Sequence, residues 1–163
     1  MSAWIALSDR EENEAWERVR LRLRFRSSVS SGQWPGILEP SPFKTFSVAH
    51  FWEAADQARL EDDLESKAAA LFQACTEPDT RLYALDWQHE CYWLQPHQLT
   101  PRERWIVPAF PDGDYHMFLS QDLGFGWFGH PWEHSICVFG APLLRVLDAN
   151  RPELFAKVIR ALT

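Results

Sequence analysis

The sequence predicts an α+β fold, in which a curled antiparallel β-meander sheet has N-terminal and C-terminal helices packed on one face. Two segments with helical periodicity in the first half of the chain are followed by short aromatic segments that alternate as strands do. These strands follow one another too closely for parallel crossovers. With 163 residues the chain has the length of one domain, so we expect residues 1–163 to form a single core.

The first helix is expected to begin after Ser8 and to end near Leu23. Ser8 and Glu11 have the spacing of a capping box, in which each side chain binds the backbone amide of the other residue. Val19 and Leu23 share one helical face. Residues 18–26 also alternate strictly between arginine and apolar residues, which is strand periodicity. We therefore expect a short extended piece after the helix.

A proline-rich loop and a second helix follow. Residues 27–43 contain three prolines and two glycines, which predicts a surface loop. Residues 51–76 are expected to be helical because apolar side chains, including Leu60 and Leu64, recur on one face. The acidic residues of this helix, Glu65 among them, are expected to lie largely off that face.

The remaining chain is predicted to supply the sheet and the C-terminal helices. Short segments rich in aromatic and β-branched residues predict six strands. These segments are residues 81–89, 91–95, 105–110, 114–120, 124–128 and 135–139. Asp112-Gly113 is a hairpin signal. Helices are expected at residues 141–147 and 152–162, because Pro152 suits the first turn of a helix.

Composition narrows the function classes. The net charge is −7, and the one arginine run, residues 18–26, is expected to form a solvated helix face, so we expect no nucleic-acid partner. No window approaches the roughly 18 apolar residues of a membrane span, and the N-terminus lacks a signal-peptide pattern. Three cysteines without CxxC spacing predict reduced thiols. We expect a cytoplasmic monomer or small homo-oligomer without membrane contact.

Residues 111–140 are the richest in functional side chains, because they concentrate histidines, acids, tryptophans and five of the seven glycines. Within them, glycine and proline bracket His130 in residues 129–134 and fix its backbone. Glu133 could orient this imidazole and make it a proton carrier. The structural alternative is a tight connection in which His130 caps backbone groups and Trp132 packs against the sheet.

Two further groups extend the predicted site. Asp114 and His116 would share a strand face, as a proton relay or as a mere surface pair. Trp87 and His89 end an aromatic row and would line the mouth of a pocket. The complete prediction is a catalytic set of His130, His116, Glu133 and Asp114, with the ligand-binding residues Trp87, His89, Trp132 and Trp127.

We expect neither a metal ion nor a cofactor. His130 and His134 could share a metal ion with His116 and His89 only if the fold brings these residues together. The general-base position of an HExxH motif is absent, and so is a glycine-rich phosphate loop. Metal and nucleotide chemistry are therefore less favoured than cofactor-independent acid–base chemistry.

The sequence leaves two functional hypotheses open. The first is a small cytoplasmic protein whose Trp/His/acid-lined pocket binds a small organic ligand, and which uses acid–base chemistry if it is an enzyme. The alternative is an immunity-type module that binds a protein and neutralises a toxin. The negative charge suits a basic toxin, since complementary charge speeds association.

Several motifs together resemble a bacterial family that is catalogued as domain of unknown function 2716. The resemblance spans nearly the whole chain. Its motifs are residues 83–89 with Cys91-Tyr92, residues 111–115 with Phe118-Leu119, and residues 128–133 with residues 137–140. This resemblance implies no role for any residue. A looser similarity, in the order of elements alone, is to immunity proteins of the SMI1/KNR4 type, and fold likeness alone does not give function.

Overall fold

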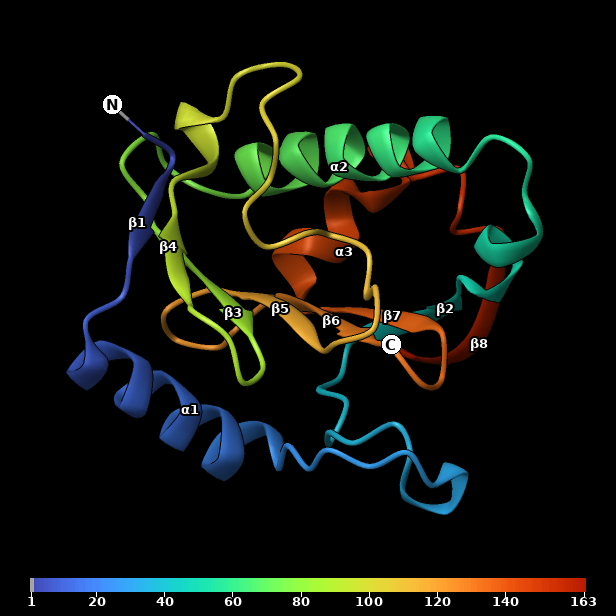
Figure 1. Ribbon diagram of the computed structural model, residues 1–163, viewed down its shortest axis with the longest axis horizontal. Coiled ribbons are helices and arrows are strands. Elements are labelled where there is room, and N and C mark those ends of the chain that lie inside the picture. Colours follow the sequence, from blue (N-terminus) through green and yellow to red (C-terminus); the bar gives the residue numbers. More distant parts are fainter. Residues whose placement is uncertain (1) are drawn as a thin grey trace.

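The computed structural model describes residues 2–163, in which one open antiparallel sheet of eight strands lies between helices (Figure 1). This confirms the α+β class. The strand order is β1-β4-β3-β5-β6-β7-β2-β8. The strands are β1 (Trp4–Ala6), β2 (Phe43–Ser47), β3 (Leu82–Asp86), β4 (Tyr92–Leu94), β5 (His116–Leu119), β6 (Gly126–His130), β7 (Ser135–Phe139) and β8 (Lys157–Leu162). The helices are α1 (Asp9–Leu23), α2 (Gln57–Ala74) and α3 (Ala141–Leu147).

Helices cover both faces of the sheet, so the predicted packing on one face is wrong. In Figure 1, α1 lies below the sheet, whereas α2 and α3 lie above it. All positions of β6 and β7 are buried, so each face of the central sheet needs its own covering layer. Neighbouring residues of β6 point to opposite layers, because Trp127 joins the core under α2 and α3 while Phe128 joins the core over α1.

The predicted start and end of α1 are both confirmed. The Ser8 hydroxyl accepts a hydrogen bond from the Glu11 amide (3.2 Å), and the Ser8 amide donates to the Glu11 carboxylate (2.9 Å). Arg24 follows the helix with a positive φ of 56°, which ends the helical hydrogen bonding. The chain then runs extended beside the loop, where the Arg26 amide donates to the Gly36 carbonyl (2.8 Å).

The predicted helix over residues 152–162 is wrong, because residues 157–162 form the edge strand β8. This strand pairs antiparallel with β2, which lies between β7 and β8. Val158 and Ile159 are β-branched and suit a strand. The pairing also places Arg160 against two carboxylates, as described below. Long-range pairing therefore overrides the local helical pattern of this segment.

The strand predicted at residues 105–110 is also wrong. This segment crosses the α2 side of the sheet without pairing, and Trp105, Val107 and Phe110 are buried in the core. Asp112-Gly113 is a turn, with φ of 76° at Gly113, and it does not join two paired strands. Strands β1 and β2 were not predicted from the sequence. In residues 2–163, no helix combines the length and apolar character of a membrane span.

Candidate functional site

The structure separates the predicted site residues into distinct places. His89, Asp114 and His116 converge beside the ends of β3 and β5. His130 and Glu133 lie at the turn between β6 and β7. The predicted tryptophans divide between the core, the α1 side and the surface. The single pocket that the sequence predicts from these residues is therefore not formed.

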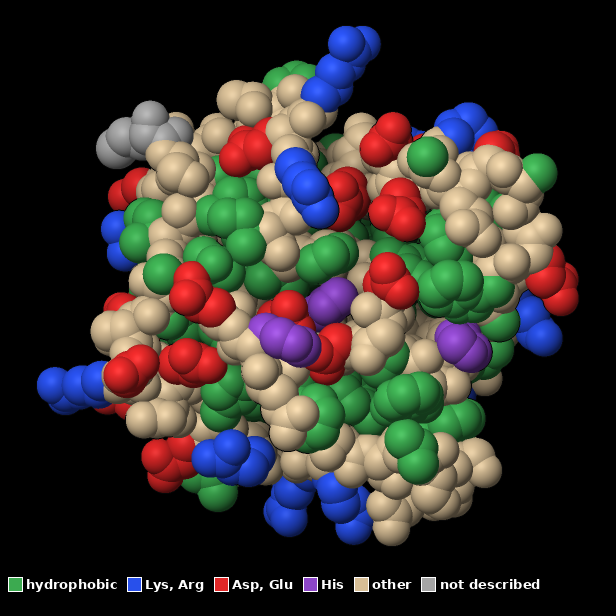
Figure 2. All heavy atoms as spheres, in the orientation of Figure 1, with side chains coloured by type: hydrophobic (Ala, Val, Ile, Leu, Met, Phe, Trp, Pro, Cys, Tyr) green, Lys and Arg blue, Asp and Glu red, His purple; other side chains and the backbone are tan. Residues whose placement is uncertain are grey.

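A tight turn brings His89 to Asp86. In a strand over residues 81–89 these two side chains would point to opposite faces, but β3 ends at Asp86 and Gln88 takes a positive φ of 65°. The chain consequently folds back. Nδ1 of His89 lies 3.1 Å from the Asp86 carboxylate and 2.7 Å from the Asp114 carboxylate. Figure 2 shows histidine side chains surrounded by acidic ones near the middle of the face that it presents.

His116 completes this cluster from within the sheet. Its side chain is 4% exposed, and its Nδ1 lies 2.8 Å from the Phe110 carbonyl. Nε2 faces Asp86 at 3.5 Å. The predicted pair of Asp114 and His116 is thus replaced by contacts that run through Asp86 and His89. We call Asp86, His89, Asp114 and His116 the Asp–His cluster.

The charges of the Asp–His cluster act on one another. Burial raises the pKa of Asp86, but hydrogen bonds from His116 and His89 outweigh burial and leave this pKa below its usual value. Burial raises the pKa of Asp114, and the nearby charge of Asp86 adds to this effect. Hydrogen bonding to Asp86 raises the pKa of His89. The Asp–His cluster therefore places carboxylate groups directly beside the exposed imidazole of His89.

His130 is fully buried and caps backbone groups, which agrees with the structural alternative considered above. Its Nδ1 accepts hydrogen bonds from the amides of Trp132 (3.2 Å) and Glu133 (3.1 Å). Burial lowers the pKa of His130 to about 4, so the ring is neutral near pH 7. In residues 2–163 no hydrogen bond joins the ring to the Glu133 carboxylate, which instead binds Arg160 and Ser135. The predicted acid–base pair is not formed.

The three predicted tryptophans have three different environments. Trp127 is fully buried, and its indole N–H donates to the Ala109 carbonyl (3.2 Å). Trp132 is 45% exposed. Trp87 lines a hollow of about 490 Å³. Trp16 of α1 lines the same hollow. Trp127 is thus a core residue and lines no accessible pocket, whereas Trp87 does line a hollow, although one without the predicted histidines.

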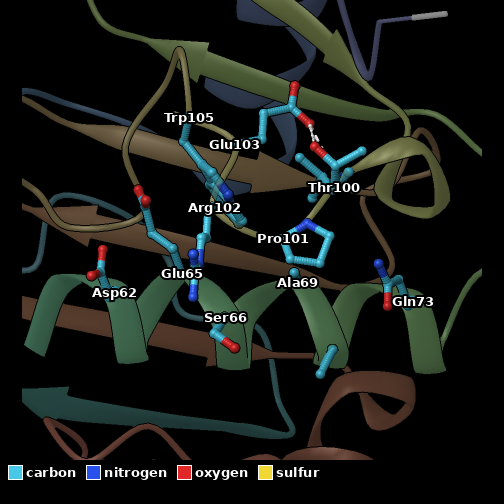
Figure 3. A pocket seen from close by; sticks show the side chains of 12 residues that line it. Asp62, Glu65, Ser66, Ala69, Gln73, Thr100, Pro101, Arg102, Glu103 and Trp105 are labelled. Atoms are coloured by element: carbon cyan, nitrogen blue, oxygen red, sulfur yellow. Dashed lines mark hydrogen bonds between the residues drawn. The ribbon is translucent and has the colours of Figure 1, made fainter. Parts of the chain in front are cut away.

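A cavity of about 800 Å³ lies between α2 and residues 99–105 (Figure 3). None of the predicted site residues lines it. Its walls combine carboxylates, an arginine, hydroxyl and amide groups and a tryptophan. The lining residues are Asp62, Glu65, Ser66, Ala69, Ala70, Gln73, Leu99, Thr100, Pro101, Arg102, Glu103 and Trp105.

Glu65 is the most perturbed carboxyl group of this cavity. Its pKa is raised from 4.5 to about 7, mainly by burial and also by the charges of Glu61 and Asp62, while a hydrogen bond from the Ala109 amide (3.3 Å) opposes them. At neutral pH the acid and the carboxylate forms of Glu65 are therefore both populated. A local signal existed, because Glu65 follows buried Leu64 directly and lies beside the apolar face of α2.

The opposite wall supplies groups that can position a ligand. Figure 3 shows Arg102 reaching towards α2 beside Glu65, with Trp105 next to it. Arg102 has a positive φ of 66°, which turns the chain at the cavity rim. Thr100 donates its amide (3.0 Å) and its hydroxyl (3.2 Å) to Glu103 and so fixes the segment's start. The cavity thus offers a proton carrier, a cation and an aromatic wall.

Comparison with known proteins assigns the family. A family model described as "Protein of unknown function (DUF2716)" matches residues 6–144. The chain belongs to this family. The chain is also similar to the uncharacterized protein YxiI of Bacillus subtilis (strain 168), with 34% identity over 162 residues and coverage of 95% of this chain and 98% of that protein.

The DUF2716 match covers α1, α2, the first half of α3 and most of the sheet, and it ends before β8. It includes both the Asp–His cluster and the cavity at Glu65. No solved structure matches the chain. The looser likeness to SMI1/KNR4-type immunity proteins is not confirmed.

Proposed function

We propose that this is a cytoplasmic protein that binds a small organic ligand in the cavity at Glu65 and performs cofactor-independent acid–base chemistry there. The observation that carries the proposal is a half-buried carboxyl with a pKa of about 7 on the wall of a cavity large enough for such a ligand. A general acid or base works best when its pKa lies near the operating pH. The ligand class and the acid–base chemistry are those expected from the sequence, but the residues that line the site are different.

The cavity also limits the ligands that fit. Arg102 can hold a carboxylate or another polar oxygen of the ligand, and Trp105 offers a flat apolar surface. Glu65 in its carboxylate form then accepts a proton from the ligand. Glu65 in its acid form donates this proton back. The ligand class that fits is a small oxygen-rich organic acid with a weakly acidic C–H or O–H group.

This proposal predicts proton exchange that depends on Glu65. Small carbonyl and carboxylic acids would be incubated with the protein in D₂O, and loss of their C–H signals would be followed by ¹H NMR. We expect exchange with at least one compound, slowed about 100-fold or more by Glu65→Gln, since a positioned acid–base group contributes about 10²–10⁴ to rate. The same compound should shift the indole N–H signal of Trp105.

The matched control is Glu61→Gln, one helical turn earlier on α2 and outside the cavity lining. This variant should slow exchange far less than Glu65→Gln does, because Glu61 acts on Glu65 through its charge alone. Equal rates for Glu65→Gln and wild type would contradict the assignment of Glu65. A library that moves no signal of residues 99–105 would contradict the ligand site itself.

The second candidate function is the immunity-type module. Trp52 and Trp132 are 46% and 45% exposed, and the ring of Trp52 lies 6.4 Å from that of His134, two residues after Trp132. Half-exposed tryptophans are typical of protein interfaces. A basic toxin that protects both indole groups and leaves Trp105 unchanged would favour this function over the first.

A further inference from the structure

We propose that the Asp–His cluster is a binding site for a divalent metal ion of the zinc class, held by Asp86, His89, Asp114 and His116. This inference is independent of the cavity at Glu65. Three of its ligand atoms, one each from Asp86, His89 and Asp114, lie within 4.8 Å of one another. Two imidazoles and two carboxylates form a donor set that zinc accepts, and their two negative charges balance the ion.

The spacing of the donor atoms fits one ion between them. A tetrahedral zinc ion with bonds of about 2.0–2.2 Å separates its ligand atoms by about 3.3–3.5 Å. Nδ1 of His89 lies 2.7 Å and 3.1 Å from the Asp114 and Asp86 carboxylates, and Nε2 of His116 lies 3.5 Å from Asp86. Shifts of a few tenths of an ångström therefore bring the ligand atoms of His89, Asp86 and Asp114 to one ion, whereas Nε2 of His116 lies outside this close group and reaches the ion by a larger movement.

His116 supplies an independent observation. A carbonyl oxygen only accepts hydrogen bonds, so the 2.8 Å contact with Phe110 places a hydrogen on Nδ1 of His116. In the neutral ring, Nε2 then carries a lone pair, and this lone pair faces the Asp86 carboxylate in a side chain that is 4% exposed. The contact between this nitrogen and the carboxylate is favourable when a cation lies between them, either a proton on Nε2 or a metal ion. A ring N–H bound to a backbone carbonyl is also the usual support of a metal-ligating histidine.

The supporting shell extends to Asp114. The Tyr115 amide donates to Oδ1 of Asp114 (2.9 Å), which leaves Oδ2 directed at His89. Asp86 and His116 are register partners in the β3–β5 pair, so the sheet itself fixes two ligands. The His89 side chain is 63% exposed and gives the ion access from solvent. The competing arrangement is a proton on Nδ1 of His89, which also lies 3.1 Å from the Trp87 carbonyl.

Metal titration decides between the ion and the proton. Untagged full-length protein would be dialysed against a chelator and titrated with zinc chloride by calorimetry, and with cobalt chloride by absorption spectroscopy. We expect one zinc ion per chain, and cobalt bands of a tetrahedral N/O site. Asp114→Asn and His89→Gln should each weaken zinc binding by about 100-fold or more, since loss of mere supporting residues already costs about 10–100-fold.

The control is Asp112→Asn, which changes an exposed carboxylate two residues before Asp114. This variant should bind zinc as wild type does. His89 lies on an exposed turn, so His89→Gln should keep the wild-type melting temperature without metal and should keep the protein folded. A wild-type protein that binds no stoichiometric zinc, or variants that bind it as tightly as wild type does, would overturn the proposal.

Discussion

Replacing Arg160 with alanine is expected to lower the free energy of unfolding by about 3 kcal/mol. Arg160 donates to Glu39 (2.8 and 3.2 Å) and to Glu133 (2.9 and 2.8 Å), whose side chains are only 7% and 11% exposed. Removing one partner of a buried ion pair leaves charge uncompensated, which costs about 3–5 kcal/mol. Arg160 is 33% exposed, so solvent screening places the effect at the lower end of this range.

Urea unfolding of the Arg160→Ala variant measures this loss. Lys157→Ala, on the same strand but exposed and without an ion pair in the described chain, is the matched control, and we expect it to change stability by less than about 0.5 kcal/mol. Equal stability of the two variants would contradict the role of Arg160 in joining the loop that carries Glu39 to the turn that carries Glu133.

Replacing Trp127 with alanine is expected to cost about 3–5 kcal/mol, the usual loss for a large aromatic residue in a core. Trp127 is fully buried, and its ring packs at 5.8 Å from Phe72 and 5.3 Å from Phe155. Removing its indole N–H also leaves the Ala109 carbonyl without its hydrogen-bond partner.

Trp132→Ala is the comparison for Trp127→Ala, because the sequence assigned both tryptophans to one ligand site. Trp132 is 45% exposed, so its loss should cost less than about 1 kcal/mol by thermal or urea unfolding. Similar losses for the two variants would contradict the placement of Trp127 in the core and Trp132 at the surface.

Elements with strong local signals could be predicted from the sequence. The capping box of Ser8 and Glu11 defines the start of α1, and α3 and β7 match their predicted residues. Elements that depend on distant partners could not. Residues 157–162 carry a helix-like apolar pattern and become a strand only because β2 offers an edge.

The candidate sites follow the same rule. Asp114 and His116 were predicted to lie close together, and the cluster includes both, but His89 joins them through a turn that strand alternation does not reveal. Glu65 was placed off the apolar face of its helix. Its burial arises from residues 99–105, which fold over α2 from a distant part of the sequence. The place of Glu65 beside the apolar face is a local signal, but the burial that raises its pKa depends on these tertiary contacts.

The raised pKa of Glu65 also makes the stability of the folded protein depend on pH. The folded protein holds a proton up to about pH 7, whereas the unfolded chain releases it near 4.5. This contribution is fully present below pH 4.5 and is lost as the pH rises through about 7. In Glu65→Gln this loss should vanish, and stability should fall less between pH 5 and pH 7.

The most direct test of the account is the titration of the Glu65 carboxyl carbon by ¹³C NMR. We predict a midpoint of about 7 for this signal, set by burial in the cavity wall. Glu65→Gln assigns the resonance by its absence. A Glu65 midpoint near 4.5 would contradict both the burial of this carboxyl group and its role as the proton carrier.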